Sequence, residues 1–107
     1  MIELPIKPIS INQCFQGRRF RTKEFKQWQN DMLKVMPKRS KLAGGVKVAI
    51  TLFLKSIYRS DCDNFLKPII DCIVKRGWIT DDRFIQYLEV AKVKSKVEKI
   101  GIEIGTL

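Results

Sequence analysis

An acidic segment joins a stretch with strand periodicity to a stretch with helical periodicity, and this junction most constrains the fold. Between Val46 and Lys55, apolar side chains alternate with a second, half-apolar set. This pattern predicts a central strand whose second face must be covered. Residues 64–76 repeat instead with a helical period, and Gly77 supplies a stop signal. A strand, an acidic loop and an amphipathic helix therefore follow one another.

The start of this helix carries two opposing signals. Asp63 can cap the N-terminus with its carboxylate, whereas Pro68 lacks a backbone N–H and is tolerated only in or near the first turn. We expect Asp63 to cap a helix that runs from about Asn64 to Arg76. Its polar stripe holds Asn64, Lys67, Asp71 and Lys75.

Four further segments complete the predicted secondary structure. Residues 2–6 alternate as a short strand, and Thr22 is placed to cap a helix of about fifteen residues. Strands are expected over residues 84–94 and 100–104. The buried face of the first helix is predicted to hold Phe25, Trp28, Gln29, Met32 and Met36. The order β–α–β–α–β–β predicts one α/β (α+β) domain over residues 1–107, with a mixed sheet and two main helices.

Five of the eleven acidic residues gather after the central strand, in a chain of formal net charge +10. Taken singly, such aspartates are typical of helix caps and turns. Together they form two acidic pairs and a helical aspartate that can converge: Asp61, Asp63, Asp71, Asp81 and Asp82. Mg²⁺ is bound by carboxylate oxygens, waters and substrate phosphates. The group therefore predicts a divalent-metal site that acts on a polyanion.

The surplus of positive charge, from 21 basic against 11 acidic residues, favours a nucleic-acid partner. Arg18, Arg19 and Arg21 surround a glycine between Phe15 and Phe20. Such a basic loop suits phosphate contacts, with a phenylalanine stacked on an unpaired base. The alternative is an ordinary solvated turn whose phenylalanines pack into the core.

Several classes of protein are excluded by composition. The chain has no histidine, which rules out His-containing zinc sites and His-based nucleophilic triads. Its three cysteines, Cys14, Cys62 and Cys72, have no CxxC spacing and are expected to stay reduced. No apolar run approaches the ~18–20 residues of a membrane span, and residues 1–5 do not resemble a signal peptide. A cytoplasmic protein without membrane contact is the expectation.

One motif carries a family resemblance. Asp61-x-Asp63-Asn64-x-x-Lys67, followed by a helix and then Gly77-x-x-x-Asp-Asp82, resembles the core of the RusA-type Holliday junction resolvases. Residues 8–12, Pro-Ile-Ser-Ile-Asn, are similar to a loop near the start of that family. The chain differs in having a proline directly after the motif lysine and in a loose match over residues 22–45.

This resemblance implies a homodimeric endonuclease that uses Mg²⁺, with Mn²⁺ as a substitute, to nick four-way DNA junctions symmetrically. Such an enzyme serves DNA recombination and repair. The resemblance assigns catalysis and metal binding to Asp61, Asp63 and Asp82, and it places Lys67 at the scissile phosphate. Asn64, Asp71 and Asp81 are expected to support these groups. The predicted DNA contacts are Asn12, Arg18, Arg19, Arg21, Arg59 and Lys67.

Two alternatives stay open at this point. The chain could be a non-catalytic basic DNA-binding protein whose aspartates only cap a helix. In an enzyme, Asp82 could join Asp61 and Asp63 of its own chain or those of the other subunit. The same-chain arrangement is preferred, because Gly77 allows a sharp reversal toward the acidic loop.

Overall fold

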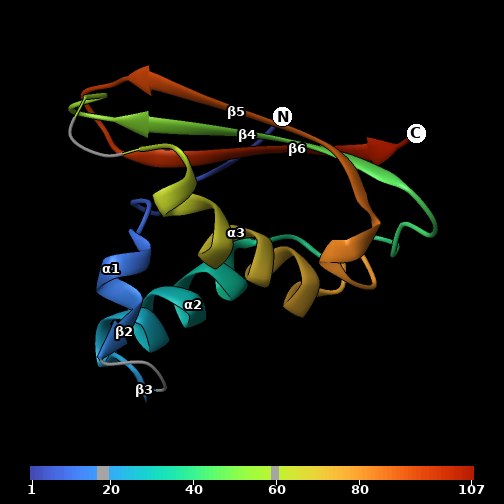
Figure 1. The fold of residues 1–107 in the computed structure, drawn as a ribbon, viewed down its shortest axis with the longest axis horizontal. Helices are drawn as coiled ribbons and strands as arrows, with labels where there is room; N and C mark the ends of the chain where they lie inside the picture. Colours follow the sequence, from blue (N-terminus) through green and yellow to red (C-terminus); the bar gives the residue numbers. More distant parts are fainter. Residues whose placement is uncertain (17–19, 59–60) are drawn as a thin grey trace.

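A computed structural model describes residues 1–16, 20–58 and 61–107, and Figure 1 shows its two layers. Four strands form a mixed sheet, and the helices lie along one of its faces. The strands of this sheet are β1 (Ile2–Leu4), β4 (Val46–Leu54), β5 (Ile85–Lys94) and β6 (Lys99–Thr106). The remaining elements are α1 (Ile11–Cys14), β2 (Phe15–Gln16), β3 (Phe20–Arg21), α2 (Lys23–Val35), α3 (Asp63–Arg76) and the 3₁₀ turn η1 (Asp82–Phe84). The predicted α+β fold with a mixed sheet and two substantial helices is confirmed.

The strand order β1-β6-β4-β5 places β4 inside the sheet, parallel to β5 and antiparallel to β6. Alternate residues of β4 are fully buried, from Val46 to Leu54, as the alternation predicts. These side chains meet the buried faces of α2 and α3 in one core. The parallel pairing of β4 with β5 makes β4–α3–β5 a crossover unit, with α3 running back along the sheet.

The opposite face of the sheet stays open. Lys47 is exposed, while Ala49, Thr51 and Phe53 are only half-buried. Among residues 1–16, 20–58 and 61–107, no helix lies over this face, so the cover expected from the half-apolar pattern does not come from the described part of the chain.

α2 begins where the sequence predicts. The Thr22 hydroxyl oxygen accepts a hydrogen bond from the Phe25 N–H at 3.1 Å, which satisfies a free donor of the first turn. Phe25, Trp28, Gln29 and Met32 are buried on this helix. Trp28 also donates its indole N–H to the Lys7 carbonyl at 2.7 Å, in agreement with the predicted core position.

The short helix α1 was not predicted, because the segment was expected to be a loop. Ser10 and Gln13 form one half of a capping box: the Gln13 side-chain oxygen accepts from the Ser10 N–H at 3.2 Å, while the Gln13 N–H donates to the Ser10 carbonyl at 3.0 Å. The Ser-x-x-Gln signature that could have revealed this turn is present in the sequence. The structure also adds the β2–β3 hairpin, which pairs Phe15 with Arg21 and Gln16 with Phe20.

The start of α3 differs from the prediction. The helix begins at Asp63 itself, its N-cap is Cys62, and no side chain caps it. Asp63 still lies in the first turn, where a negative charge is favourable beside the helix dipole. Pro68 is buried in the second turn rather than the first. Because proline has no N–H, the carbonyl of Asn64 receives no helical hydrogen bond from it. Pro68 and its neighbour Ile69 are both buried against the core.

Candidate active site

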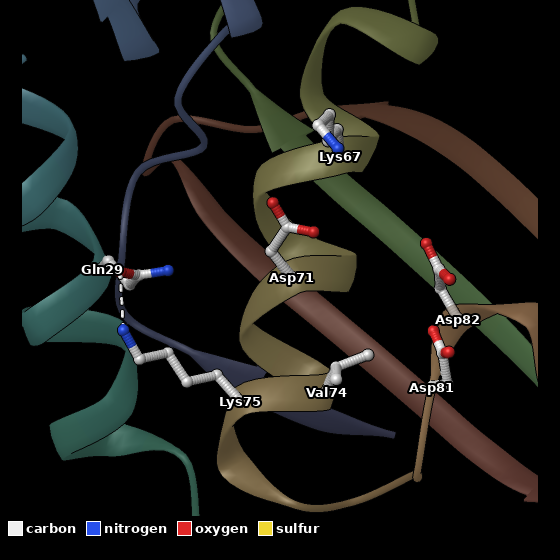
Figure 2. A pocket seen from close by; sticks show the side chains of 7 residues that line it. All are labelled: Gln29, Lys67, Asp71, Val74, Lys75, Asp81 and Asp82. Atoms are coloured by element: carbon white, nitrogen blue, oxygen red, sulfur yellow. Dashed lines mark hydrogen bonds between the residues drawn. The ribbon is translucent and has the colours of Figure 1, made fainter. Parts of the chain in front are cut away.

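The polar stripe of α3 forms one side of an open pocket of about 400 Å³. Its other lining residues come from α2 and from the segment before β5. The lining comprises Gln29, Lys67, Asp71, Val74, Lys75, Asp81 and Asp82. Figure 2 shows Lys67 and Asp71 on α3, across the pocket from the acidic pair. The structure therefore brings together four residues of the predicted site: Lys67, Asp71, Asp81 and Asp82.

The reversal after α3 positions the acidic pair. Gly77 adopts a left-handed conformation with φ 85°, which glycine accepts without the steric cost of a β-carbon. Its N–H donates to the Val74 carbonyl at 2.9 Å, and the Trp78 N–H donates to the Ile73 carbonyl at 3.1 Å. This is a Schellman ending, which satisfies the last helical carbonyls while the chain turns back.

The segment that leads to the acidic pair is anchored in the core by two buried side chains. The side chains of Trp78 and Ile79 are 0% and 1% exposed. The Trp78 indole N–H donates to the Pro37 carbonyl at 2.9 Å, and the Leu42 N–H donates to the Trp78 carbonyl at 2.9 Å. Buried residues thus anchor the backbone up to two residues before Asp81, and this anchoring fixes where the chain presents the two carboxylates.

Asp81 and Asp82 behave as one unit. A side-chain hydrogen bond between the two carboxyl groups raises the pKa of Asp82 and lowers that of Asp81. The negative charges of Asp81 and Asp71 raise the pKa of Asp82 further, while Lys67 opposes the shift. Arg83 lies 3.7 Å from Asp81 through its Nε, in an exposed ion pair. The two carboxyl groups therefore titrate as a linked pair, and negative charge gathered around Asp82 favours a nearby cation.

Asp61 and Asp63 lie apart from this pocket. Both are exposed at the start of α3 and do not line it, and Asn64 beside them is half-buried. Eight residues of helix separate Asp63 from Asp71, which corresponds to about 12 Å along the axis. In the ranges that the structure describes, no three acidic or cysteine side chains are grouped to hold a metal ion. Asp82 shares its pocket with Lys67 and Asp71 of α3; whether it joins Asp61 and Asp63 in one site stays a prediction.

The predicted DNA contacts are spread over other elements. Asn12 is exposed on α1, and Arg21 ends β3, where the structure describes its backbone alone. Arg18, Arg19 and Arg59 lie outside the described residues. Their contacts with DNA, and the stacking proposed for Phe15 and Phe20, remain predictions.

Two residues of the pocket were not assigned to the site from sequence. Lys75 was recognised only as part of the polar stripe, and Gln29 only as a member of the buried face of α2. The Lys75 ammonium donates to the Gln29 side-chain oxygen at 3.3 Å, across the contact between the two helices. Gln29 could have been recognised from the sequence, because it is a polar residue at a position of α2 where the helical pattern predicts an apolar one.

The donor set of the pocket fits a hard divalent cation. Its carboxylates supply oxygen ligands, and Mg²⁺ is commonly held by one or two carboxylates together with waters and substrate phosphates. The negative charges of Asp71 and Asp81 raise the pKa of Asp82, so the electrostatics of this pocket favour positive charge beside Asp82. The chemistry of these residues therefore suits Mg²⁺, even within one chain.

The cysteines do not contribute reactive groups to this pocket. All three are free, and burial raises the pKa of Cys14 to about 11 and that of Cys72 to about 12. Both thiols are therefore protonated and unreactive at neutral pH.

Within the described ranges, no helix combines the length and apolar character that a membrane crossing requires.

The fold and the pocket define a class of protein. A basic chain that presents carboxylates and a lysine at the edge of a small α+β domain has the groups of a phosphodiester-cleaving enzyme. The family model described as Endodeoxyribonuclease RusA matches residues 9–105, so the chain belongs to the RusA family. No individual curated protein gave a significant match. Membership implies a nuclease that resolves Holliday junctions, and it makes branched DNA the implied ligand.

Proposed function

We propose that the protein is a Mg²⁺-dependent endodeoxyribonuclease that resolves four-way junctions by paired symmetric nicks, in DNA recombination and repair. It is proposed to act in the cytoplasm as a homodimer whose subunits are single domains. The observation that carries the proposal is the meeting of Lys67 and Asp71 with Asp81 and Asp82 in one pocket. Membership of an endodeoxyribonuclease family supports this interpretation of the pocket.

The catalytic carboxylates are proposed to be Asp61, Asp63 and Asp82. Each is exposed, so each can reach a substrate or a metal ion from solvent. When bound, Mg²⁺ supplies the activation of a water nucleophile and the neutralisation of phosphoryl charge. Asp71 and Asp81 support Asp82: Asp81 through their hydrogen bond, and Asp71 through its charge on the same pocket.

Lys67 is proposed to hold the scissile phosphate. It lines the pocket one helical turn before Asp71, and its positive charge acts on Asp82. An ammonium group held here can also stabilise the negative charge that grows on the phosphoryl oxygens during in-line attack. Asn12, Arg18, Arg19, Arg21 and Arg59 are proposed to contact the DNA backbone around this point, because a net charge of +10 favours contacts with phosphates.

A homodimer follows from the symmetry of the substrate. Paired nicks at equivalent positions of a junction require two equivalent sites, which a two-fold dimer supplies. The separation of Asp61 and Asp63 from Asp82 in one chain gives the dimer a second role, since a partner could bring the two acidic groups together.

Cleavage of synthetic junctions tests the proposal. A labelled four-way junction and a linear duplex of the same sequence are incubated with the protein, with Mg²⁺, with Mn²⁺ or with EDTA. Symmetric nicks in the junction alone, and only with a divalent ion, are expected. Binding of the junction without any cleavage under these conditions would favour the non-catalytic DNA-binding alternative.

A further inference from the structure

Gln29 is a polar residue in an apolar position. It lies on the buried face of α2 with Phe25, Trp28 and Met32, and its side chain is 6% exposed. Within the described part of the chain, Gln29 is the one buried residue with a polar side chain, and the residues of the surrounding core are hydrophobic. A buried amide is costly unless its groups are hydrogen-bonded. An apolar residue would pack here at lower cost, so the amide calls for an explanation.

The amide of Gln29 is directed at the wall of the candidate site. Its oxygen accepts a hydrogen bond from the Lys75 ammonium at 3.3 Å, and both residues line the pocket with Asp71 and Lys67. Figure 2 shows Lys75 extended from α3 toward α2, where it meets the Gln29 oxygen. A lysine on a helix surface normally samples many rotamers, and a fixed acceptor restricts it. Gln29 therefore holds a positive charge at one side of the pocket.

The two lysines of the pocket are placed for different phosphates. Lys67 and Lys75 are eight residues apart on α3, about 12 Å along the axis, with Asp71 between them. Lys67 is near Asp82, because its positive charge partly opposes the rise in the pKa of Asp82. Lys75 instead lies toward α2, where it meets Gln29. A strand that places one phosphate at Lys67 would bring a different phosphate of the same strand past Lys75.

We propose that Lys75, oriented by the buried amide of Gln29, binds a second backbone phosphate of the strand that is cleaved. Lys75 is then a DNA-contact residue, and Gln29 is a positioning residue that acts through it. The inference rests on the proposed function, because it takes the pocket as the place where the cleaved strand lies. It assigns a role in DNA binding to α2, which carries none of the motif residues.

Binding of a four-way junction in Ca²⁺, where no cleavage is expected, tests the contact. For Lys75→Met we expect binding at moderate salt to weaken by about three- to tenfold, and the slope of log K against log[salt] to fall by about 0.9, the value for one lost phosphate contact. Lys75→Arg should restore both. Lys47→Met, which removes an equal charge from the open face of the sheet, is the control and should leave the slope unchanged.

Gln29→Leu tests the positioning role. Leucine keeps the apolar packing, so thermal stability should be equal or higher, while junction binding weakens by less than in Lys75→Met. In the double variant with Lys75→Met, the leucine should add no further loss. A slope unchanged by Lys75→Met, or losses from the two changes that add in the double variant, would overturn the inference.

The outcome is separable from that of the proposed function. A wild-type protein that fails to cleave in Mg²⁺ refutes the nuclease assignment, whatever the salt slopes are. A wild-type protein that cleaves while Lys75→Met retains the full slope refutes only the role of Lys75.

Discussion

The indole N–H of Trp78 donates a hydrogen bond to the carbonyl of Pro37 at 2.9 Å, and this contact ties the candidate site to the end of α2. Trp78 is 0% exposed and precedes the acidic pair by three residues. The Arg76 side chain reinforces the same junction, since its Nε donates to the Met36 carbonyl at 3.0 Å. The position of Asp81 and Asp82 therefore depends on a buried contact far from them in the sequence.

Trp78→Phe should lower both stability and activity. Phenylalanine keeps most of the packing but leaves the Pro37 carbonyl without its donor, so the free energy of unfolding should fall by roughly 1–3 kcal/mol. Urea denaturation measures this loss, and junction cleavage at a temperature where the variant is folded measures the effect on the acidic pair. Trp28→Phe is a matched control, because Trp28 also donates its indole N–H to a backbone carbonyl. It should lose stability but retain cleavage, and equal losses of cleavage would contradict the anchoring role.

Asp61→Asn, Asp63→Asn and Asp82→Asn should each abolish cleavage, because each removes a proposed oxygen ligand with negative charge. Junction binding should be unchanged or tighter, since less negative charge faces the phosphates. Gel-shift titration and cleavage of the same labelled junction give both quantities. Full activity in one of these variants would remove that aspartate from the mechanism.

Mixed dimers decide how Asp82 meets the other two carboxylates. A dimer with Asp61→Asn in one subunit and Asp82→Asn in the other has one intact site only if each site combines the two subunits. The described chain groups Asp82 with Asp71 and not with Asp61 or Asp63. We therefore expect nicking to reappear on mixing, contrary to the same-chain preference drawn from the sequence. A mixture that stays inactive, despite demonstrated subunit exchange, would support sites built from one chain.

Asp81→Asn should move the acid limit of activity. The pKa of Asp82 is raised by its hydrogen bond with Asp81, so Asp82 loses its charge at a higher pH than an ordinary aspartate. Cleavage should decline as the pH falls through this raised pKa, because a protonated carboxyl group is a poor metal ligand. Without the Asp81 carboxylate, the pKa of Asp82 drops and the decline shifts to lower pH.

The pH profile of cleavage at a fixed Mg²⁺ concentration provides this measurement, with the midpoint rather than the maximum rate as the readout. Glu103→Gln, on the open side of the sheet, removes an equal charge as a control and should leave the midpoint in place. An identical midpoint in Asp81→Asn would show that the two carboxyl groups titrate independently.

Much of the local structure is determined by the sequence alone. The alternation after Val46, the helical repeat up to Gly77 and the Thr22 cap each depend on neighbours in the chain, and all three are confirmed. The prediction for Asp63 was wrong, because Asp63 starts α3 instead of capping it. The helical turn at Ser10, where the Gln13 side-chain oxygen accepts from the Ser10 N–H, was missed.

Which acidic residues meet is decided only by the tertiary structure. Strand alternation is the same for parallel and antiparallel pairing, so the sequence cannot say at which end of β4 the segment before β5 returns. The parallel register pairs Val46 with Ile85, and it sets Asp82 near the start of β4, whereas Asp61 follows its end. β4 alone is about 26 Å long at 3.3 Å per residue. The sequence thus determined which residues carry the chemistry, while strand pairing, buried Trp78 and the reversal at Gly77 determined where they stand.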